Sequence, residues 1–235
     1  TNYKDMGDHY LLNGAKMWIS NSPKADIAVV WAKNEEGRIH GLIVERGMEG
    51  FTTPETHNKW SLRASCTGEL VFDNVKVPKE NLLGMEGMGF IMLMKELAWE
   101  RMLVAIICQA GAEAAFAHTV QYTKDRKAFG KPIGAFQNTR FKLAELRTEI
   151  DFCRTYLDRC MELQLEEKLS VDAAAAAKYK ISDMFSKIVD ECLQLHGGYG
   201  YMLEYPIARA YIDHRANRIY AGTNEIMKEL ISRTL

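Results

Sequence analysis

The sequence predicts an α+β protein of more than one domain: a small antiparallel β domain, built as a barrel or sandwich, followed by an antiparallel four-helix bundle. Three observations predict this fold class. Turn signals are frequent up to about residue 86. The runs between those turns are short and rich in β-branched and aromatic residues. From Gly89 onward the chain has the character of long helices, beginning with a stretch at 90–124 that contains no proline.

The β domain is expected over residues 1–86. Its turn signals lie at 13–14, 34–37, 47–50 and 73–74. They separate four strand-like runs, AKMWIS, DIAVVWA, RIHGLIVE and GELVFDNVKV. Short strands at this spacing are typical of a small barrel or sandwich. Because Thr1 opens directly into a polar turn and strand-like sequence, we expect this domain to be incomplete at its N-terminus.

The helical domain is expected over residues 87–235. Three long helices are predicted at 90–124, 136–168 and 171–195, with a break at the KPIG segment 131–134. Ser170 and Asp172 are candidate caps of the third helix, and the glycines at 197, 198 and 200 end it. A shorter helix is expected from about Asn224. Together these helices predict a bundle.

Composition excludes several classes of function. Of 235 residues, 47% are hydrophobic and 26% charged, and the net charge is −1, so neither nucleic acid nor an anionic membrane surface is an expected partner. No apolar run reaches the roughly 18 residues of a transmembrane helix, and the first ten residues lack the apolar centre of a signal peptide. The five cysteines are scattered without a CxxC, which predicts reduced thiols and no metal site.

Four separated segments suggest ligand chemistry: MWIS at 17–20, DRKAFGKPI at 125–133, LQLHGGYGY at 193–201 and IYAGTNEI at 219–226. On one strand face, Trp18 could cover a flat ring while Ser20 bonds a ring nitrogen; the alternative is a tryptophan in a β core. Arg126 suits a pyrophosphate or, alternatively, a surface ion pair. Glycines let a backbone approach a ligand, and a Gly-Thr-Asn helix start suits an anion.

These segments are similar to those of the acyl-CoA dehydrogenase family. The resemblance implies FAD as cofactor and, in that family, the glutamine and glycines of the third segment reach the flavin of a neighbouring subunit, which implies a homotetramer or homodimer. We interpret His196 as structural. The flavin contacts that the resemblance implies are Trp18, Ile19, Ser20, Arg126, Phe129, Gln137, Gln194, Gly197, Gly198, Thr223 and Glu225.

The catalytic base departs from the commonest family pattern. Most members carry a glutamate where this chain has Ala221. A minority, notably isovaleryl- and long-chain acyl-CoA dehydrogenases, place it on the first long helix before an arginine, and Glu100-Arg101 matches that pattern. The resemblance therefore implies that Glu100 is the base, with Glu96 as the fallback. The implied substrate contacts are Arg101, Tyr220, Ala221 and Gly222.

Helical spacing bears on the same glutamate. Residues 93, 97, 100, 104 and 107 follow an i, i+4, i+7 stripe of apolar residues in which Glu100 is the exception. We therefore expect Glu100 to be buried in an apolar strip, although this helix is apolar nearly all round. Because a backbone amide survives any side-chain change, the N–H of Ala221 is still expected to bind the thioester oxygen, as the resemblance implies.

The resemblance implies α,β-dehydrogenation of a fatty or branched acyl-CoA, with Glu100 taking the α proton and FAD the β hydride. Electron-transfer flavoprotein is the expected partner in β-oxidation, in a bacterial cytoplasm or mitochondrial matrix. An inactive flavin-binding or oligomerising relative and an acyl-CoA oxidase are the alternatives. The KWSLRAS run at 59–65 is similar to glutaryl-CoA dehydrogenase, whereas GTNEIMKELI is more like long-chain enzymes. The family's N-terminal helical domain is missing, so we expect a fragment.

Overall fold

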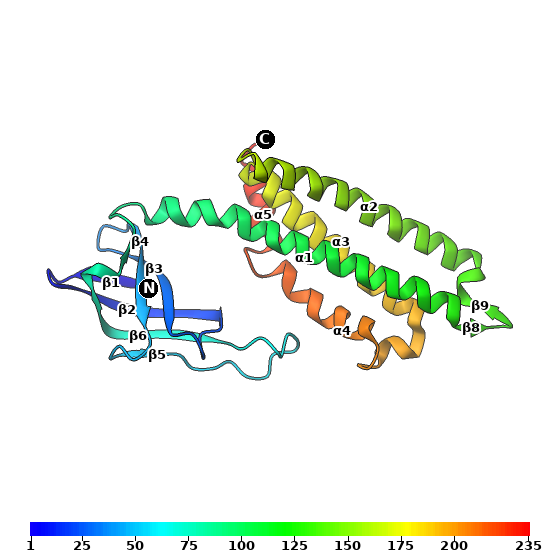
Figure 1. Ribbon diagram of the computed structural model, residues 1–235, viewed down its shortest axis with the longest axis horizontal. Helices are drawn as coiled ribbons and strands as arrows, with labels where there is room; N and C mark the ends of the chain where they lie inside the picture. The colour runs from blue at the N-terminus through cyan, green and yellow to red at the C-terminus, as the bar shows by residue number, and fades with distance from the viewer. The chain divides into compact units, whose positions relative to one another are not determined.

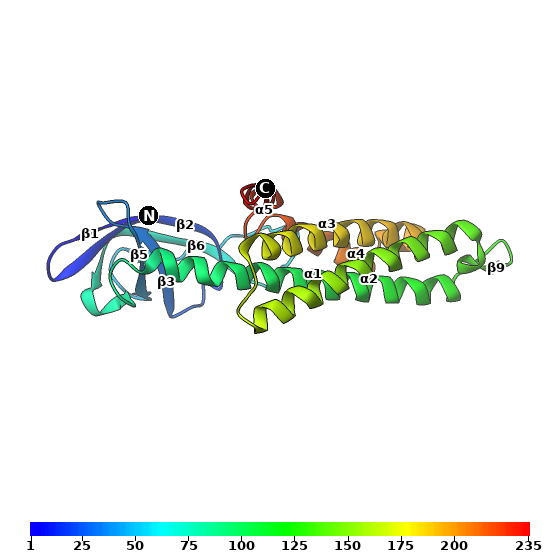
Figure 2. The ribbon, with the colours of Figure 1, turned by 90° about the horizontal axis from the view of Figure 1, so that it is seen from above.

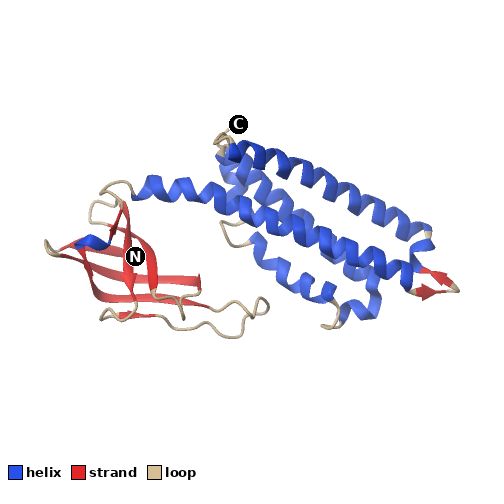
Figure 3. Cartoon of the chain, viewed as in Figure 1, coloured by secondary structure: helices blue, strands red, loops and turns tan.

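The computed structural model describes residues 1–235, which divide into two compact units, 1–95 and 96–235. The first unit is built mainly of strands and the second of helices (Figures 1 and 3). The last strand of the seven-stranded sheet ends at Leu83, and the first long helix begins at Gly89. The structure therefore confirms a sheet domain and a helical domain, and residues 1–86 and 87–235 remain our proposed limits.

The sheet unit contains one seven-stranded sheet with the order β5-β6-β2-β1-β3-β4-β7. Every pairing is antiparallel except that between β1 and β3, which is parallel. The strands β5 and β7 form the two edges of this order and do not pair with each other, so the sheet pairings do not show a closed barrel. The strands are β1 (Asn2–Asp5), β2 (His9–Ser20), β3 (Ile27–Lys33), β4 (Ile39–Glu45), β5 (Phe51–Thr52), β6 (Thr67–Pro78) and β7 (Leu82–Leu83).

Two of the predicted turns are wrong, because they lie inside strands. The pairing of β2 with β6 shifts register between Leu12 and Gly14, and Asn74 on β6 has φ 52°. The side chain of Asn13 donates to Asn74 Oδ1 at 3.1 Å and accepts from the Asn74 N–H at 2.8 Å. Asparagine and glycine tolerate the left-handed backbone of a bulge as well as that of a turn, so the sequence signal is the same for both.

Helices α1, α2 and α3 run in alternating directions and form the body of the helical unit (Figures 1 and 2). The Ser170 hydroxyl caps α3 by accepting from the Ala173 N–H, as predicted. Sequence reasoning missed α4, which is only eight residues long and starts at Pro206, and the small hairpin of β8 (Lys127–Ala128) and β9 (Lys131–Pro132). The helices are α1 (Gly89–Asp125), α2 (Gln137–Leu165), α3 (Val171–His196), α4 (Pro206–Asp213) and α5 (Asn224–Ser232).

The core of the helical unit joins α1, α2 and α3, and small side chains let α1 and α3 approach closely. Ala105, Cys108 and Ala112 on α1 are fully buried in this core. At Gly111 a Cβ atom would lie 2.6 Å from Cζ of Phe185 on α3, closer than two carbons can pack. Glycine at 111 therefore sets the spacing of α1 and α3.

Helix α1 also passes a length and composition test for a membrane span, which corrects the expectation that no segment would. An 18-residue window has a mean hydropathy of 1.4, and 39% of it is buried within the chain. The difference arises because this window tolerates a few charged residues. Core helices of soluble proteins have the same length and composition, so these two properties are weak evidence for a membrane span.

We expect Gly111→Leu to lower the free energy of unfolding by about 3 kcal/mol, because the new side chain must displace Phe185 in a close-packed core. Ala110→Leu is the matched control, since Ala110 is the exposed neighbour on the same helix. Urea unfolding followed by circular dichroism measures both variants. Equal stabilities for the two variants would show that the approach of α1 to α3 is not tight at this point.

Candidate functional site

The end of strand β2 presents Trp18 outward. A second register shift lies between Lys16 and Ile19, and Trp18 has φ 64°, a strained conformation for a bulky residue. The Trp18 side chain is 65% exposed, and Ser20 is exposed too, whereas Ile19 between them packs against the sheet core. The alternative of a core tryptophan is therefore excluded, since the bulge aims this flat ring away from the core.

At the far end of α1, four of the predicted contacts line one hollow of about 590 Å³. They are Arg126, Gln194, Gly197 and Gly198. The guanidinium of Arg126 lies 5.2 Å from the ring centroid of Tyr199, which also lines the hollow. A Cβ atom at either glycine would meet no other atom within 4 Å, so both glycines border open space. The hollow thus offers an exposed cation and bare backbone.

Phe129 and Gln137 lie outside this lining. Phe129 is 97% exposed in the turn between β8 (Lys127–Ala128) and β9 (Lys131–Pro132), with φ 50°. Its ring lies 6.3 Å from that of Phe136. Gln137 is exposed at the first position of α2. An almost fully exposed phenylalanine with left-handed backbone has no role in the fold of this chain that would explain it.

His196 closes the inner side of the hollow. Its ring is buried, Nδ1 lies 2.9 Å from the Cys192 carbonyl oxygen, and Tyr122 stacks on it with centroids 4.1 Å apart. Burial lowers the pKa of His196, and the backbone contact only partly offsets this effect. The imidazole is therefore neutral at pH 7 and held by its neighbours. The structural interpretation of His196 stays a prediction.

A second group of predicted residues lies in the loop before α5. Ala221 and Gly222 both have left-handed backbone, with φ 54° and 85°. Thr223 caps α5, and its hydroxyl accepts from the Ile226 N–H at 3.3 Å. Tyr220 donates from its hydroxyl to Asn217 Oδ1. This loop leads into the positive end of a helix dipole, a place that favours negative charge. Glu225 is exposed in the first turn of that helix.

Helix α1 brings Arg101 to the same region. Arg101 is 8% exposed, and its buried Nε has no hydrogen-bond partner. Burial lowers the pKa of Arg101, against the opposing effect of the neighbouring Glu100 carboxylate. A buried donor without a partner costs stability, so the position of Arg101 needs an explanation beyond packing.

The expectation that Glu100 is buried within an apolar strip is wrong for this chain. Glu100 is exposed, as are Leu103 and Ile107 on the same side of α1. The buried side of α1 instead passes through Met102 and Ala105. Because this helix is apolar nearly all round, periodicity alone did not tell its inner face from its outer one. Glu96, the fallback, is exposed as well.

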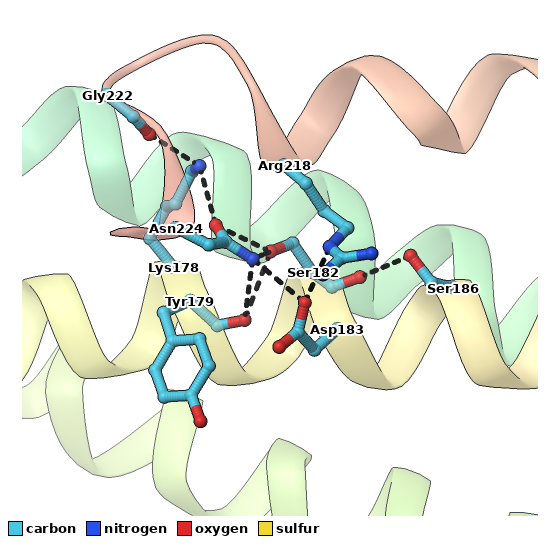
Figure 4. A network of polar contacts seen from close by, with 8 residues as sticks. All are labelled: Lys178, Tyr179, Ser182, Asp183, Ser186, Arg218, Gly222 and Asn224. Carbon is cyan, nitrogen blue, oxygen red and sulfur yellow. Dashed lines mark hydrogen bonds and ion pairs between the residues drawn. The ribbon is translucent and has the colours of Figure 1, made fainter. Parts of the chain in front are cut away.

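Sequence reasoning missed Lys178, which is fully buried on α3. Its Nζ donates to the Gly222 carbonyl at 2.7 Å and to Asn224 Oδ1 at 2.9 Å (Figure 4). Burial lowers the pKa of Lys178 to about 8. Lys178 lies four residues after the buried Ala174 and three before the buried Ile181. This helical spacing was a signal in the sequence that the side chain faces inward.

The two groups of residues are far apart within the helical unit. Arg101 lies about a third of the way along α1 and Arg126 directly follows its last residue, so a rise of about 1.5 Å per residue separates them by about 37 Å. Figures 1 and 2 show α5 and the β8–β9 hairpin at opposite ends of this unit. One flavin dinucleotide cannot span that distance, so the hollow and the loop of one chain cannot contact the same dinucleotide.

Comparison with known families gives two matches. The family described as "Acyl-CoA dehydrogenase, C-terminal domain" matches residues 87–235, and "Acyl-CoA dehydrogenase, middle domain" matches residues 1–75. Between them the two matches span nearly the whole chain.

Individual proteins agree with these matches. The chain is 45% identical to the mitochondrial long-chain specific acyl-CoA dehydrogenase of Sus scrofa, over 100% of this chain and 56% of that protein. A crystal structure of an acyl-CoA dehydrogenase from Geobacillus kaustophilus superposes with a TM-score of 0.96 at 46% identity, over 100% of this chain and 63% of the other. A glutaryl-CoA dehydrogenase from Mycobacterium smegmatis in complex with FADH2 gives 0.95 at 32% identity, over 100% and 60%. The chain thus spans little more than half the length of these relatives.

The buried imidazole gives a pH-dependence prediction. Because the pKa of His196 is lower in the folded chain than its ordinary value of 6.5, the unfolded chain takes up the proton first as pH falls. Stability is therefore lost progressively below pH 6.5. We expect His196→Phe, which keeps a ring against Tyr122, to lose less stability than the wild type between pH 7 and 5. The measurement is the free energy of unfolding in urea across that range; parallel pH curves would contradict it.

Proposed function

The chain belongs to the acyl-CoA dehydrogenase family, and from this premise we propose that it carries out flavin-dependent α,β-dehydrogenation of a fatty or branched acyl-CoA thioester. One observation carries the finer proposal. Arg101 and Cys108 on α1 lie close enough to act electrostatically on Lys178 of α3, which bonds the Gly222 carbonyl of the 220–223 loop. Glu100 is therefore carried by a helix near this loop, and the loop itself has Ala221 where most of the family has a glutamate.

The residues present fit the cofactor, FAD. The Arg126 guanidinium is exposed at the rim of a hollow, where it can donate two parallel hydrogen bonds to a diphosphate. Gly197 and Gly198 leave the backbone open to close approach. Trp18 presents a flat, exposed ring at a bulge, and Ser20 two residues later is exposed as well, so both are open to a planar ring system. When bound, FAD supplies a two-electron acceptor for the β hydrogen.

A second copy of the chain is part of this proposal. Gln194 and the glycines line the same hollow as Arg126, at the opposite end of the helical unit from Thr223 and Glu225. If the third segment reaches the flavin of a neighbouring subunit, Arg126 must reach that same flavin. Each site then draws on two subunits, in agreement with a homodimer or homotetramer. Phe129, exposed beside the hollow's arginine, is available to the same neighbour.

Glu100 is the proposed base for the α proton, with Glu96 as the fallback. Its exposure leaves the carboxylate open to a substrate, and the exposed Leu103 and Ile107 beside it give that side of α1 an apolar lining for an acyl chain. Arg101, whose Nε has no hydrogen-bond partner within the chain, is the proposed donor to a polar group of the thioester. Ala221 cannot accept a proton, so a carboxylate from another element is required.

The loop supplies the complementary half of the chemistry. As the α proton leaves, negative charge builds on the thioester oxygen, and fixed donors lower the cost of that charge. We propose that the Ala221 N–H is such a donor, with the α5 N-terminus behind it adding a favourable field. Tyr220 and Gly222 then flank the thioester.

Two alternatives have distinct outcomes. An acyl-CoA oxidase shares the same half-reaction but releases peroxide in air instead of passing electrons to an electron-transfer flavoprotein, so an oxygen-consumption assay separates the two. An inactive relative would bind flavin without being bleached by acyl-CoA. A series of acyl-CoA lengths and branches would then define the substrate.

We expect Glu100→Gln to lower the turnover number with acyl-CoA by about 10²–10⁴-fold, because an amide cannot accept the α proton. Glu96→Gln, one turn earlier on α1, is the matched control and should retain turnover. Flavin content from visible absorbance should be equal in both variants. Full turnover in Glu100→Gln would sink the assignment of the base.

We expect Arg126→Gln to weaken FAD binding by about 10- to 100-fold, the effect of losing hydrogen bonds from a charged donor to a diphosphate. Lys127→Gln removes an exposed cation next in sequence and controls for the change in net charge. Equilibrium dialysis of FAD against each variant measures the difference. Equal affinities would remove Arg126 from the flavin site.

A further inference from the structure

The buried ammonium of Lys178 donates its hydrogen bonds to the loop before α5 and to the first residue of that helix. Its two acceptors, the Gly222 carbonyl and the Asn224 side chain, lie on either side of Thr223 (Figure 4). Two bonds from one rigidly buried atom to both flanks of a residue restrict the backbone more than a single bond would. They also hold Gly222 with its left-handed φ of 85°, next to Ala221 at 54°.

The contacts of Asn224 extend this anchor across α3. Its Nδ2 donates to Ser182 Oγ at 3.0 Å and to Asp183 Oδ1 at 2.9 Å. Asp183 in turn pairs with Arg218 at 2.7 Å, in the 3₁₀ turn His214–Arg218 that precedes the loop (Figure 4). Both ends of the 219–223 segment are therefore tied to the same face of α3.

Stability does not explain a lysine at this position. Desolvation is the largest cause of its lowered pKa, so the surroundings disfavour the charged form. Whole networks of buried charge can often be replaced by apolar residues without loss of stability. The neighbouring alanines Ala174, Ala175 and Ala177 show that this part of α3 is otherwise packed with apolar side chains.

We infer that Lys178 is a positioning residue: its ammonium fastens the loop on both sides of Thr223 and so holds the Ala221 N–H in the orientation that receives the thioester oxygen. This inference rests on the proposed function for the role of the Ala221 amide, whereas the fastening of the loop is independent of it. Lys178 touches neither substrate nor cofactor in this scheme and acts through the loop.

The inference has a pH signature. The charged and titratable groups that face the ammonium are Cys108 and Arg101 on α1, Asp183 on α3 and Glu225 on α5. The pKa of Lys178 is lowered to about 8, so the ammonium is present below that pH and lost above it. A neutral amine donates weaker hydrogen bonds than an ammonium. The loop should therefore loosen as pH rises through 8, while Cys108 does not titrate there because burial raises its pKa to about 12.

Lys178→Met tests the fastening directly in the full 235-residue chain. We expect amide hydrogen exchange over 219–224 to accelerate at least about tenfold relative to exchange in the core of α2, so that a general loss of stability is separated from a loosened loop. Lys187→Met, an exposed lysine on the same helix paired with Glu149, is the matched control and should leave loop exchange unchanged. Unchanged loop exchange in Lys178→Met would overturn the inference.

The wild-type chain provides a second test that does not depend on the variant folding. After correction for the intrinsic pH dependence of exchange, protection of 219–224 should fall between pH 7 and 9, while protection of the core of α2 stays constant. A constant ratio between the two segments would overturn the inference. Neither measurement needs turnover, so a loop that loosens in a chain without dehydrogenase activity would refute the proposed function and leave the fastening intact. With active protein, acyl-CoA turnover should fall over the same pH range in the wild type only.

Discussion

The length of helix α1 is the constraint on which the rest of the site depends. One unbroken helix of 37 residues carries Glu100 and Arg101 about a third of the way along it and leads into Arg126 just after its end. An α-helix is stiff over that length, so the two positions cannot approach each other within one chain. Under the proposed function, a flavin that needs residues from both ends of the helical unit must therefore be held by two chains, which would make assembly a condition for a complete site.

The sequence predicted most of this fold because the deciding signals are local. Helix limits followed from proline, glycine and caps, and the four motifs lie within short segments. The failures share a cause as well. The pairs at 13–14 and 73–74 require left-handed backbone in a turn or in a bulge alike, and only the pairing of β2 with β6 distinguishes the two. Likewise, α1 has apolar residues on nearly every side, so its hydrophobic pattern did not distinguish the exposed face that carries Glu100 from the buried face.

Lys178 shows the limit for polar residues. A lysine after a run of alanines reads as a solvated position on a helix, although its spacing matches the buried side of α3. Its partners are a backbone carbonyl and an asparagine more than 40 positions later. Only the tertiary fold brings these acceptors together, so a buried cation of this kind is found from coordinates and not from periodicity.

Two buried cations beside one loop then have a common explanation. Arg101 and Lys178 are both disfavoured by desolvation, and each raises the cost of burying the other. A fold selected for stability alone would place apolar side chains there. Under the proposed function, negative charge that develops on a substrate oxygen beside the loop offsets this cost, because Arg101 is proposed to bond the thioester and Lys178 holds the loop whose amide receives the oxygen. In that scheme the cost of burying the two cations is offset more in the charged transition state than in the bound substrate, and catalysis requires such a difference.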